Sequence, residues 1–191
     1  MPETEIITVV SGLPRSGTSM MMRMLEAAGL SILTDGLRAP DADNPRGYYE
    51  FERVKKLESD AAWLPEARGR VVKIVSPLLK HLPPGHRYKV VFMRRRMEEV
   101  LASQRQMLVR RGRTEDGDPA AMGEVFRRHL DRVEAWLEHQ AHVDVLYVDY
   151  NALVAGAGDD LERLQTFLGG DLQVDRMAEV IERTLHRQRT G

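Results

Sequence analysis

Residues 12 to 19 read "GLPRSGTS" and place two glycines, one arginine and three hydroxyls in one short loop. The loop follows an apolar run and leads directly into a helical pattern. Gly12 and Gly17 let the backbone curl and approach an oxyanion closely, and Arg15 brings a positive charge. The hydroxyl donors belong to Ser16, Thr18 and Ser19. Because a helix N-terminus also attracts anions, this pattern predicts an anion-binding loop and not a bare strand-to-helix turn.

The glycines have the spacing of the phosphate-binding pattern G-x-x-x-x-G-K-S/T, but Thr18 stands where that pattern has lysine. In ATP-binding loops the lysine and a hydroxyl that binds Mg²⁺ act as a pair. Here the hydroxyls are present and the cation lies earlier, at Arg15. The position of this cation argues against an ATP–Mg²⁺ loop, although a small-molecule kinase with a variant loop remains an alternative.

A second basic cluster follows the apolar run "KVVFM", where Arg94, Arg95 and Arg96 stand in a row. If the sheet is parallel, these arginines lie on the same edge as the first loop. They would then bind a second anionic group there. The alternative is a basic collar that pairs with Glu98 and Glu99 on a solvated helix.

Taken together, the two segments resemble the sulfotransferase family. "GLPRSGTS" looks like the loop that grips the 5′-phosphosulfate of 3′-phosphoadenosine 5′-phosphosulfate (PAPS). "FMRRRMEEVLAS" looks like the family's 3′-phosphate site, which aligns Arg95, an acidic residue at Glu99 and a serine at Ser103. The family usually has Asn-Pro after the arginine, whereas this chain has Arg96-Met97, so Arg94 and Arg95 remain interchangeable in this role.

The resemblance extends from Val9 to about Gly169, because "VLYVDYNALVAGAGDDLERLQTFLG" is similar to the family's stretch ending in "FLG". It implies that PAPS donates a sulfuryl group to a hydroxyl or amine and leaves as PAP, without a metal. The residues it assigns to the cofactor are Arg15, Ser16, Gly17, Thr18, Ser19, Arg95 and Ser103. The acceptor, a small molecule or peptide, is not identified by the sequence.

Sulfuryl transfer needs a base for the acceptor proton and a cation near the leaving oxygen. Many members carry Lys-Thr-His at the end of the second main strand. This chain has Lys73-Ile74-Val75, so the lysine matches and the histidine does not. Besides Arg15, Lys73 is therefore a candidate for stabilising the leaving group, with a solvent-facing strand-end lysine as the alternative.

The candidate base is Glu50, in the run "DNPRGYYEFERV", which resembles a segment of bacterial sulfotransferase-like proteins. The alternative role for Glu50 is electrostatic stabilisation of a helix N-terminus. Asp35 and Glu52 are other candidates for the base.

Two groups of residues are more simply explained without a catalytic role. His81 and His86 read as loop histidines. The late arginines Arg187 and Arg189 read as a basic tail, although family members often bring late basic residues onto the 3′-phosphate.

These side chains need a scaffold, and the chain alternates short β-branched runs with helical stretches. After the first run, strands are expected at Arg70–Val75, Lys89–Met93 and Val143–Val148. Helices are expected at Ser16–Ala28, Phe51–Trp63, Met97–Arg111, Ala120–His142, Asp159–Leu168 and Asp175–Arg187. Strands that alternate with helices indicate an α/β fold, a three-layer, doubly wound and mostly parallel sheet. We expect residues 1–191 to form a single domain.

Composition narrows the function further. The formal net charge of −1 argues against binding nucleic acid through bulk charge. The absence of cysteine excludes disulfides and cysteine nucleophiles. No signal peptide or run of ~20 apolar residues is visible, so we expect a cytoplasmic protein without membrane contact. A non-catalytic module that binds PAP or PAPS remains another alternative for the function. The sequence does not indicate the oligomeric state.

Overall fold

The computed structural model describes residues 5–37, 47–110, 112, 118–156 and 159–181. Its strands are β1 (Ile6–Gly12), β2 (Val71–Lys73), β3 (Arg87–Arg94) and β4 (Val143–Asp149). They form one sheet in the order β2-β1-β3-β4, and every neighbouring pair is parallel. The predicted α/β fold with a parallel sheet is confirmed. Since the chain first crosses to one side of β1 and then to the other, a crevice is expected at the carboxyl ends of β1 and β3.

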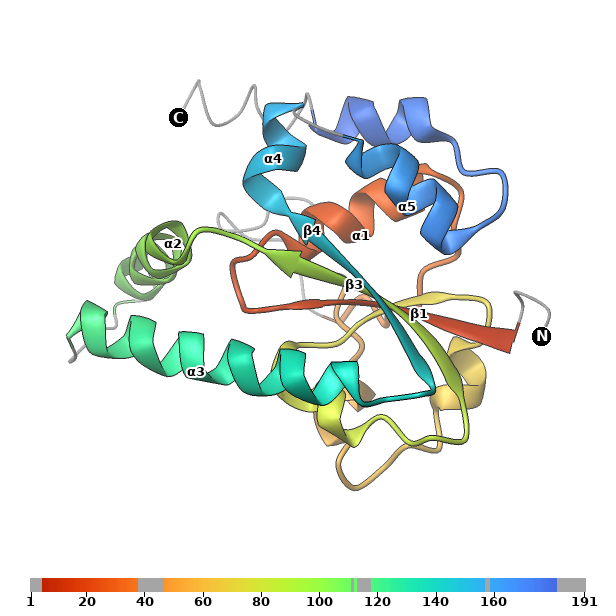
Figure 1. Cartoon of the computed structure of the whole chain (residues 1–191), viewed down its shortest axis with the longest axis horizontal. Helices are drawn as coiled ribbons and strands as arrows, with labels where there is room; N and C mark the ends of the chain where they lie inside the picture. The colour runs from red at the N-terminus through yellow and green to blue at the C-terminus, as the bar shows by residue number, and fades with distance from the viewer. Residues whose placement is uncertain (1–4, 38–46, 111, 113–117, 157–158, 182–191) are drawn as a thin grey trace.

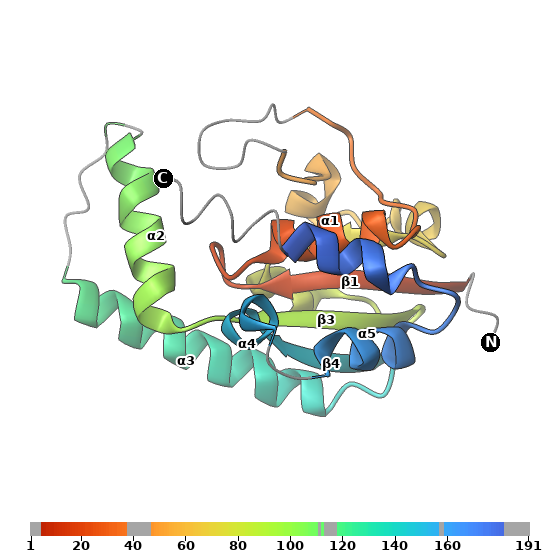
Figure 2. The same ribbon diagram turned by 90° about the horizontal axis from the view of Figure 1, so that it is seen from above.

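Helices cover both faces of the sheet (Figure 1). On one face lie α1 (Thr18–Ala27), α4 (Tyr150–Ala155), α5 (Asp160–Leu168) and the helical residues 174–181. On the other face lie α3 (Pro119–Glu138) and the 3₁₀ segments η2 (Glu52–Lys56), η3 (Leu64–Ala67) and η4 (Ser76–His81). The helix α2 (Met97–Arg110) stands beyond the carboxyl end of β3, beside the first turns of α3 (Figure 2).

Two hydrophobic clusters, one on each face, hold these layers together. Along β3, Val91 and Met93 belong to the cluster beneath α1, whereas Val90 and Phe92 belong to the cluster on the opposite face. This alternation follows from the period of two in a strand. Both faces are buried, which explains why the strand sequences read as continuous apolar runs.

The segment 51–63 differs from the predicted helix. It contains only the 3₁₀ segment η2 followed by a turn, in which the carboxylate of Asp60 accepts a hydrogen bond of 3.0 Å from the backbone N–H of Ala62. This local bond competes with helix continuation. The spacing of Val54 and Leu57, both buried, suits a 3₁₀ turn, in which residues three apart share a face.

The other helices agree with the prediction to within a few residues, and α4, η3 and η4 were not predicted. The last predicted helix is seen over 174–181. Its remainder, together with Arg187 and Arg189, lies outside the described residues. Among the helices that are described, none is long and apolar enough to cross a membrane.

Candidate active site

The two predicted anion-binding segments lie side by side at the carboxyl edge of the sheet. Strands β1 and β3 are neighbours, and their register places Gly12 opposite Met93. The loop that follows β1 therefore lies next to the arginines that follow β3. The sheet topology brings together two segments that are about eighty residues apart in sequence.

Ser16 shapes the first loop from inside. Its side chain is buried, and both its backbone N–H and its hydroxyl donate to the carbonyl oxygen of Leu13, over 3.2 and 2.7 Å. The hydroxyl therefore stabilises the turn and does not line the pocket. Of the three predicted hydroxyl donors, Thr18 and Ser19 do line it.

Both glycines of the loop are required by close approaches. A Cβ atom on Gly12 would lie 2.6 Å from the carbonyl oxygen of Met93, and one on Gly17 would lie 2.4 Å from the ring of Tyr150. Gly17 also has φ of 100° and forms the N-cap of α1, where it offers no side chain for capping. The first turn of α1 thus opens toward the pocket with its own N–H groups.

Arg15 lies at the centre of the loop in a left-handed backbone conformation, with φ of 71°. Such a conformation costs on the order of 1 kcal/mol for a residue with a Cβ atom. It is held by Arg95, whose Nη1 donates to the carbonyl oxygen of Arg15 over 3.1 Å. The guanidinium of Arg15 in turn donates through Nε to the hydroxyl of Ser103 over 2.9 Å. The three residues predicted to bind the two ends of the nucleotide are therefore in direct contact.

Arg95 is itself fixed by two further neighbours. Its Nε donates to the carboxylate of Glu99 over 2.9 Å, and its guanidinium stacks 4.4 Å from the ring centroid of Tyr150. Glu99 also accepts a bond of 2.7 Å from the side chain of Asn151. Burial opposes ionisation of Glu99, but the hydrogen bonds from Arg95 and Asn151 outweigh it and hold the pKa of this carboxyl below its ordinary value.

Arg94 points away from this cluster. It forms a bidentate ion pair with Glu134 of α3, and its guanidinium stacks 3.9 Å from the centroid of the Tyr147 ring. Adjacent residues at the end of a strand face opposite sides of the sheet. Arg95 is therefore the arginine that lines the pocket, whereas Arg94 anchors α3 to the sheet.

The pocket has a volume of about 1160 Å³ and is lined by residues from the loop after β1 through the start of α4. All the predicted site residues except Ser16 line it. Among the described residues its walls carry six cationic side chains and two carboxylates, Glu50 and Glu99. The cations are Arg15, Arg23, Lys55, Lys73, Arg95 and Arg105. This excess of positive charge suits a ligand with several negative charges.

Glu50 and Lys73 reach the pocket from the side of β2. Lys73 is the last residue of β2, and its Nζ donates to the carbonyl oxygen of Tyr48. The backbone carbonyl of Glu50 accepts from the hydroxyl of Thr34, over 2.8 Å, and from the N–H of Asp35, over 3.3 Å. The segment that carries Glu50 is thus tied both to β2 and to the chain that runs beside it.

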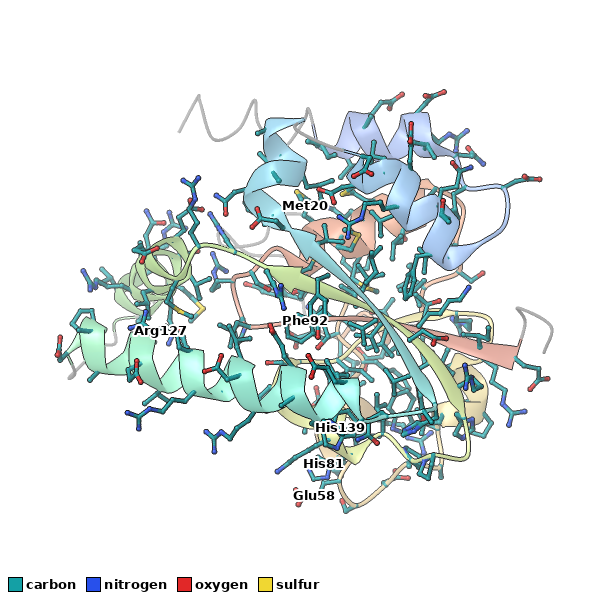
Figure 3. All side chains as sticks on the ribbon, in the orientation of Figure 1. Met20, Glu58, His81, Phe92, Arg127 and His139 are labelled. Carbon is teal, nitrogen blue, oxygen red and sulfur yellow. The ribbon has the colours of Figure 1, made fainter. Side chains whose placement is uncertain are left out.

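The other candidate bases are engaged elsewhere. The carboxylate of Asp35 accepts from the N–H groups of Leu37 and Glu52, and these bonds outweigh burial and hold its pKa below its ordinary value. Glu52 pairs with Lys55. His81 is the last residue of η4, in the layer of the 3₁₀ segments, and lies away from Met20 of α1 (Figure 3). His81 and His86 do not line the pocket.

Several residues that shape the site carry only weak sequence signals. Tyr150 and Asn151 follow β4 and brace Arg95 and Glu99, yet an "Asp-Tyr-Asn" run after a strand has no distinctive pattern. Arg23 and Arg105 line the pocket from helices α1 and α2, where charged residues usually face solvent. Across the described ranges, no group of three or more His, Cys, Asp or Glu residues is arranged to hold a metal ion.

Comparison with known families agrees with this geometry. The family model described as the sulfotransferase domain matches residues 6–188 of the 191. No curated protein matches the chain. The matched range includes both predicted anion-binding segments, Glu50 and Lys73.

Proposed function

The chain belongs to the sulfotransferase family, and we propose that it transfers a sulfuryl group from PAPS to a hydroxyl or amine of a small-molecule or peptide acceptor. The observation that carries this proposal is the direct contact between Arg15, Arg95 and Ser103. It joins a helix-N-terminal anion loop to a second cationic site in one pocket. A ligand with anionic groups at two separated positions fits that arrangement better than a simple phosphate does.

The donor set of the pocket suits such a nucleotide. Near the first turn of α1, the guanidinium of Arg15 and the hydroxyls of Thr18 and Ser19 provide charge-assisted donors for the phosphosulfate end. At the other end, Arg95 and Ser103 would bind the 3′-phosphate, since both side chains point into the same pocket. Ser16 contributes by fixing the turn and not by direct contact.

PAPS, when bound, supplies the sulfuryl group, and the residues of this chain supply charge and proton transfer. The acceptor proton passes to the carboxylate of Glu50 as the bond from acceptor to sulfur forms. The bond from sulfur to the phosphate oxygen breaks, and Arg15 and Lys73 stabilise the charge that develops on that oxygen. For this role the Nζ of Lys73 must turn from the Tyr48 carbonyl, its present partner, toward the ligand.

Transfer from PAPS labelled with radioactive sulfur to a panel of alcohols, phenols and amines tests the proposal. We expect labelled product with at least one acceptor, without added Mg²⁺. Glu50→Gln should lower kcat by about a hundredfold or more, as loss of a general base does. Glu52→Gln is the matched control, because this neighbouring carboxylate pairs with Lys55 and does not itself line the pocket. Full turnover in Glu50→Gln would remove Glu50 as the base.

A further inference from the structure

Two residues other than glycine have a left-handed backbone among the residues described, and both belong to segments of the pocket. They are Arg15, with φ of 71°, and Tyr49, with φ of 52°. A bulky residue keeps this conformation only where its surroundings enforce it. The contact with Arg95 accounts for Arg15. Tyr49 has no part in the proposed cofactor site, so its conformation calls for a separate explanation.

Tyr49 lies between two residues that line the pocket, Tyr48 and Glu50. Its own side chain points elsewhere: the ring packs against the hydrophobic cluster beneath α1, and the hydroxyl donates to Glu26 of α1 over 2.6 Å. Two residues later, Phe51 packs against the cluster on the opposite face of the sheet, edge-on to Trp63 with 5.3 Å between ring centroids. Glu50 is therefore the point at which the chain passes from one cluster to the other.

The backbone around Glu50 is also tied on both sides. Before it, the carbonyl of Tyr48 accepts from Lys73. At Glu50 itself, the carbonyl accepts from Thr34 and from the N–H of Asp35. These bonds fix the ends of the segment, but the left-handed turn at residue 49 sets the direction from which the Glu50 side chain leaves the backbone.

We propose that Tyr49 is a positioning residue for Glu50. Its hydroxyl, anchored on Glu26, and its ring, packed beneath α1, enforce the left-handed turn that presents the Glu50 carboxylate to the pocket. What Glu50 does there rests on the proposed function, whereas the anchor itself does not.

The anchor is tested by hydrogen exchange of two backbone amides, measured by NMR on the full chain. The amide of Asp35 donates to the carbonyl of Glu50, and the amide of Glu52 donates to the carboxylate of Asp35. In Tyr49→Phe and in Glu26→Ala, both amides should exchange about fivefold faster or more, because the segment opens locally. The amide of Ile74, which directly follows β2 and donates to Val10 of β1, is the control for overall stability and should not change.

Matched controls separate the anchor from general effects. Tyr147→Phe removes a phenol hydroxyl from the opposite edge strand, and Glu58→Ala removes an exposed carboxylate in the turn after η2 (Figure 3). Neither should alter the exchange of the Asp35 or Glu52 amide. Glu26→Gln keeps an oxygen that accepts from Tyr49. The Asp35 and Glu52 amides should therefore exchange more slowly in Glu26→Gln than in Glu26→Ala.

A kinetic measurement tests whether the anchor acts through Glu50. With labelled PAPS and the best acceptor of the panel, Tyr49→Phe should lower kcat about fivefold while the affinity for PAP, measured by calorimetry, stays the same. In a Glu50→Gln background, Tyr49→Phe should cause no further loss, since residues that act as a unit are not additive. A merely structural role would lower the residual activity again or weaken PAP binding.

The outcomes separate the two proposals. Unchanged exchange in both Tyr49→Phe and Glu26→Ala overturns the anchor, whatever the activity. Faster exchange together with a full additive loss of kcat in the Glu50→Gln background overturns its action through Glu50. Faster exchange in the two variants, together with a wild-type chain that binds PAP but transfers to no acceptor, supports the anchor and contradicts the proposed function.

Discussion

The Nε atom of Arg15 donates a hydrogen bond of 2.9 Å to the Oγ atom of Ser103, across 88 residues of sequence. This bond joins the anion loop after β1 to the helix that follows β3. Arg95, which lies just before that helix, also donates a hydrogen bond to the carbonyl oxygen of Arg15. The two ends of the proposed nucleotide site are therefore linked by hydrogen bonds, and a substitution at one end should also alter the side-chain positions at the other.

Ser103→Ala should weaken the binding of PAP by about tenfold or more, because hydrogen bonds to charged groups contribute at this level. The variant removes a proposed donor for the 3′-phosphate and also the oxygen that accepts from the guanidinium of Arg15. Calorimetric titration measures the loss. Ser59→Ala serves as the control, since its hydroxyl donates to the carbonyl of Lys56 in an exposed turn. Wild-type affinity in Ser103→Ala would refute the assignment of this serine.

Arg95→Lys should lower PAP affinity by about tenfold although it preserves the charge. A lysine has no planar fork and cannot serve the Arg15 carbonyl and Glu99 while stacking on Tyr150. The neighbouring substitution Arg96→Lys is the control, because Arg96 is exposed and does not line the pocket. Calorimetric titration with PAP measures both affinities. Equal PAP affinities for Arg95→Lys and Arg96→Lys would contradict the proposed role of Arg95.

Parts of the site were predictable because their signals are local or come from a known family. The cluster of hydrogen-bond donors around Arg15 and the spacing from Arg95 to Ser103 are visible in the amino-acid sequence itself. The choice between Arg94 and Arg95 could not be read in the same way. It depends on which side of β3 each side chain leaves, and on the presence of Glu134 on a helix that follows in the chain.

The segment after Glu50 shows a different limit. Its apolar residues were read as an α-helix, but packing on Trp63 and the turn at Asp60 select a short 3₁₀ segment. The short α4 was missed because its start depends on Asp149, whose side chain accepts from the N–H of Ala152 over 2.8 Å. A single capping residue at the end of a strand gives too weak a pattern to predict six helical residues.

Gly17→Ala should lower the free energy of unfolding by roughly 2 kcal/mol. The new Cβ atom would meet the ring of Tyr150, and the backbone would stay in a region that disfavours side chains. Urea denaturation gives the free-energy difference. Gly85→Ala is the matched control, because nothing lies within 4 Å of the Cβ position there. Similar costs for both substitutions would argue against a constrained loop.

Glu99→Gln should make stability less dependent on acid pH. The folded pKa of Glu99 lies below its ordinary value of 4.5, so the carboxylate stabilises the fold fully above that value. This contribution is lost as the pH falls through the lowered folded pKa. The variant should therefore be less stable than wild type at about pH 7, and the difference should shrink toward about pH 3.

Urea denaturation at both pH values measures this effect, with Glu98→Gln, an exposed neighbour, as the control. A stability difference between wild type and Glu99→Gln that is equal at both pH values would show that the ion pair with Arg95 does not contribute through the charge of Glu99.

Calorimetric titration with PAP and with ADP, each with and without Mg²⁺, tests the central claim most directly. The account predicts tight binding of PAP that does not depend on the metal, and little or no binding of ADP, which lacks the 3′-phosphate that Arg95 and Ser103 are proposed to hold. Binding of ADP that requires Mg²⁺, with no preference for PAP, would contradict it and favour a kinase with a variant phosphate loop.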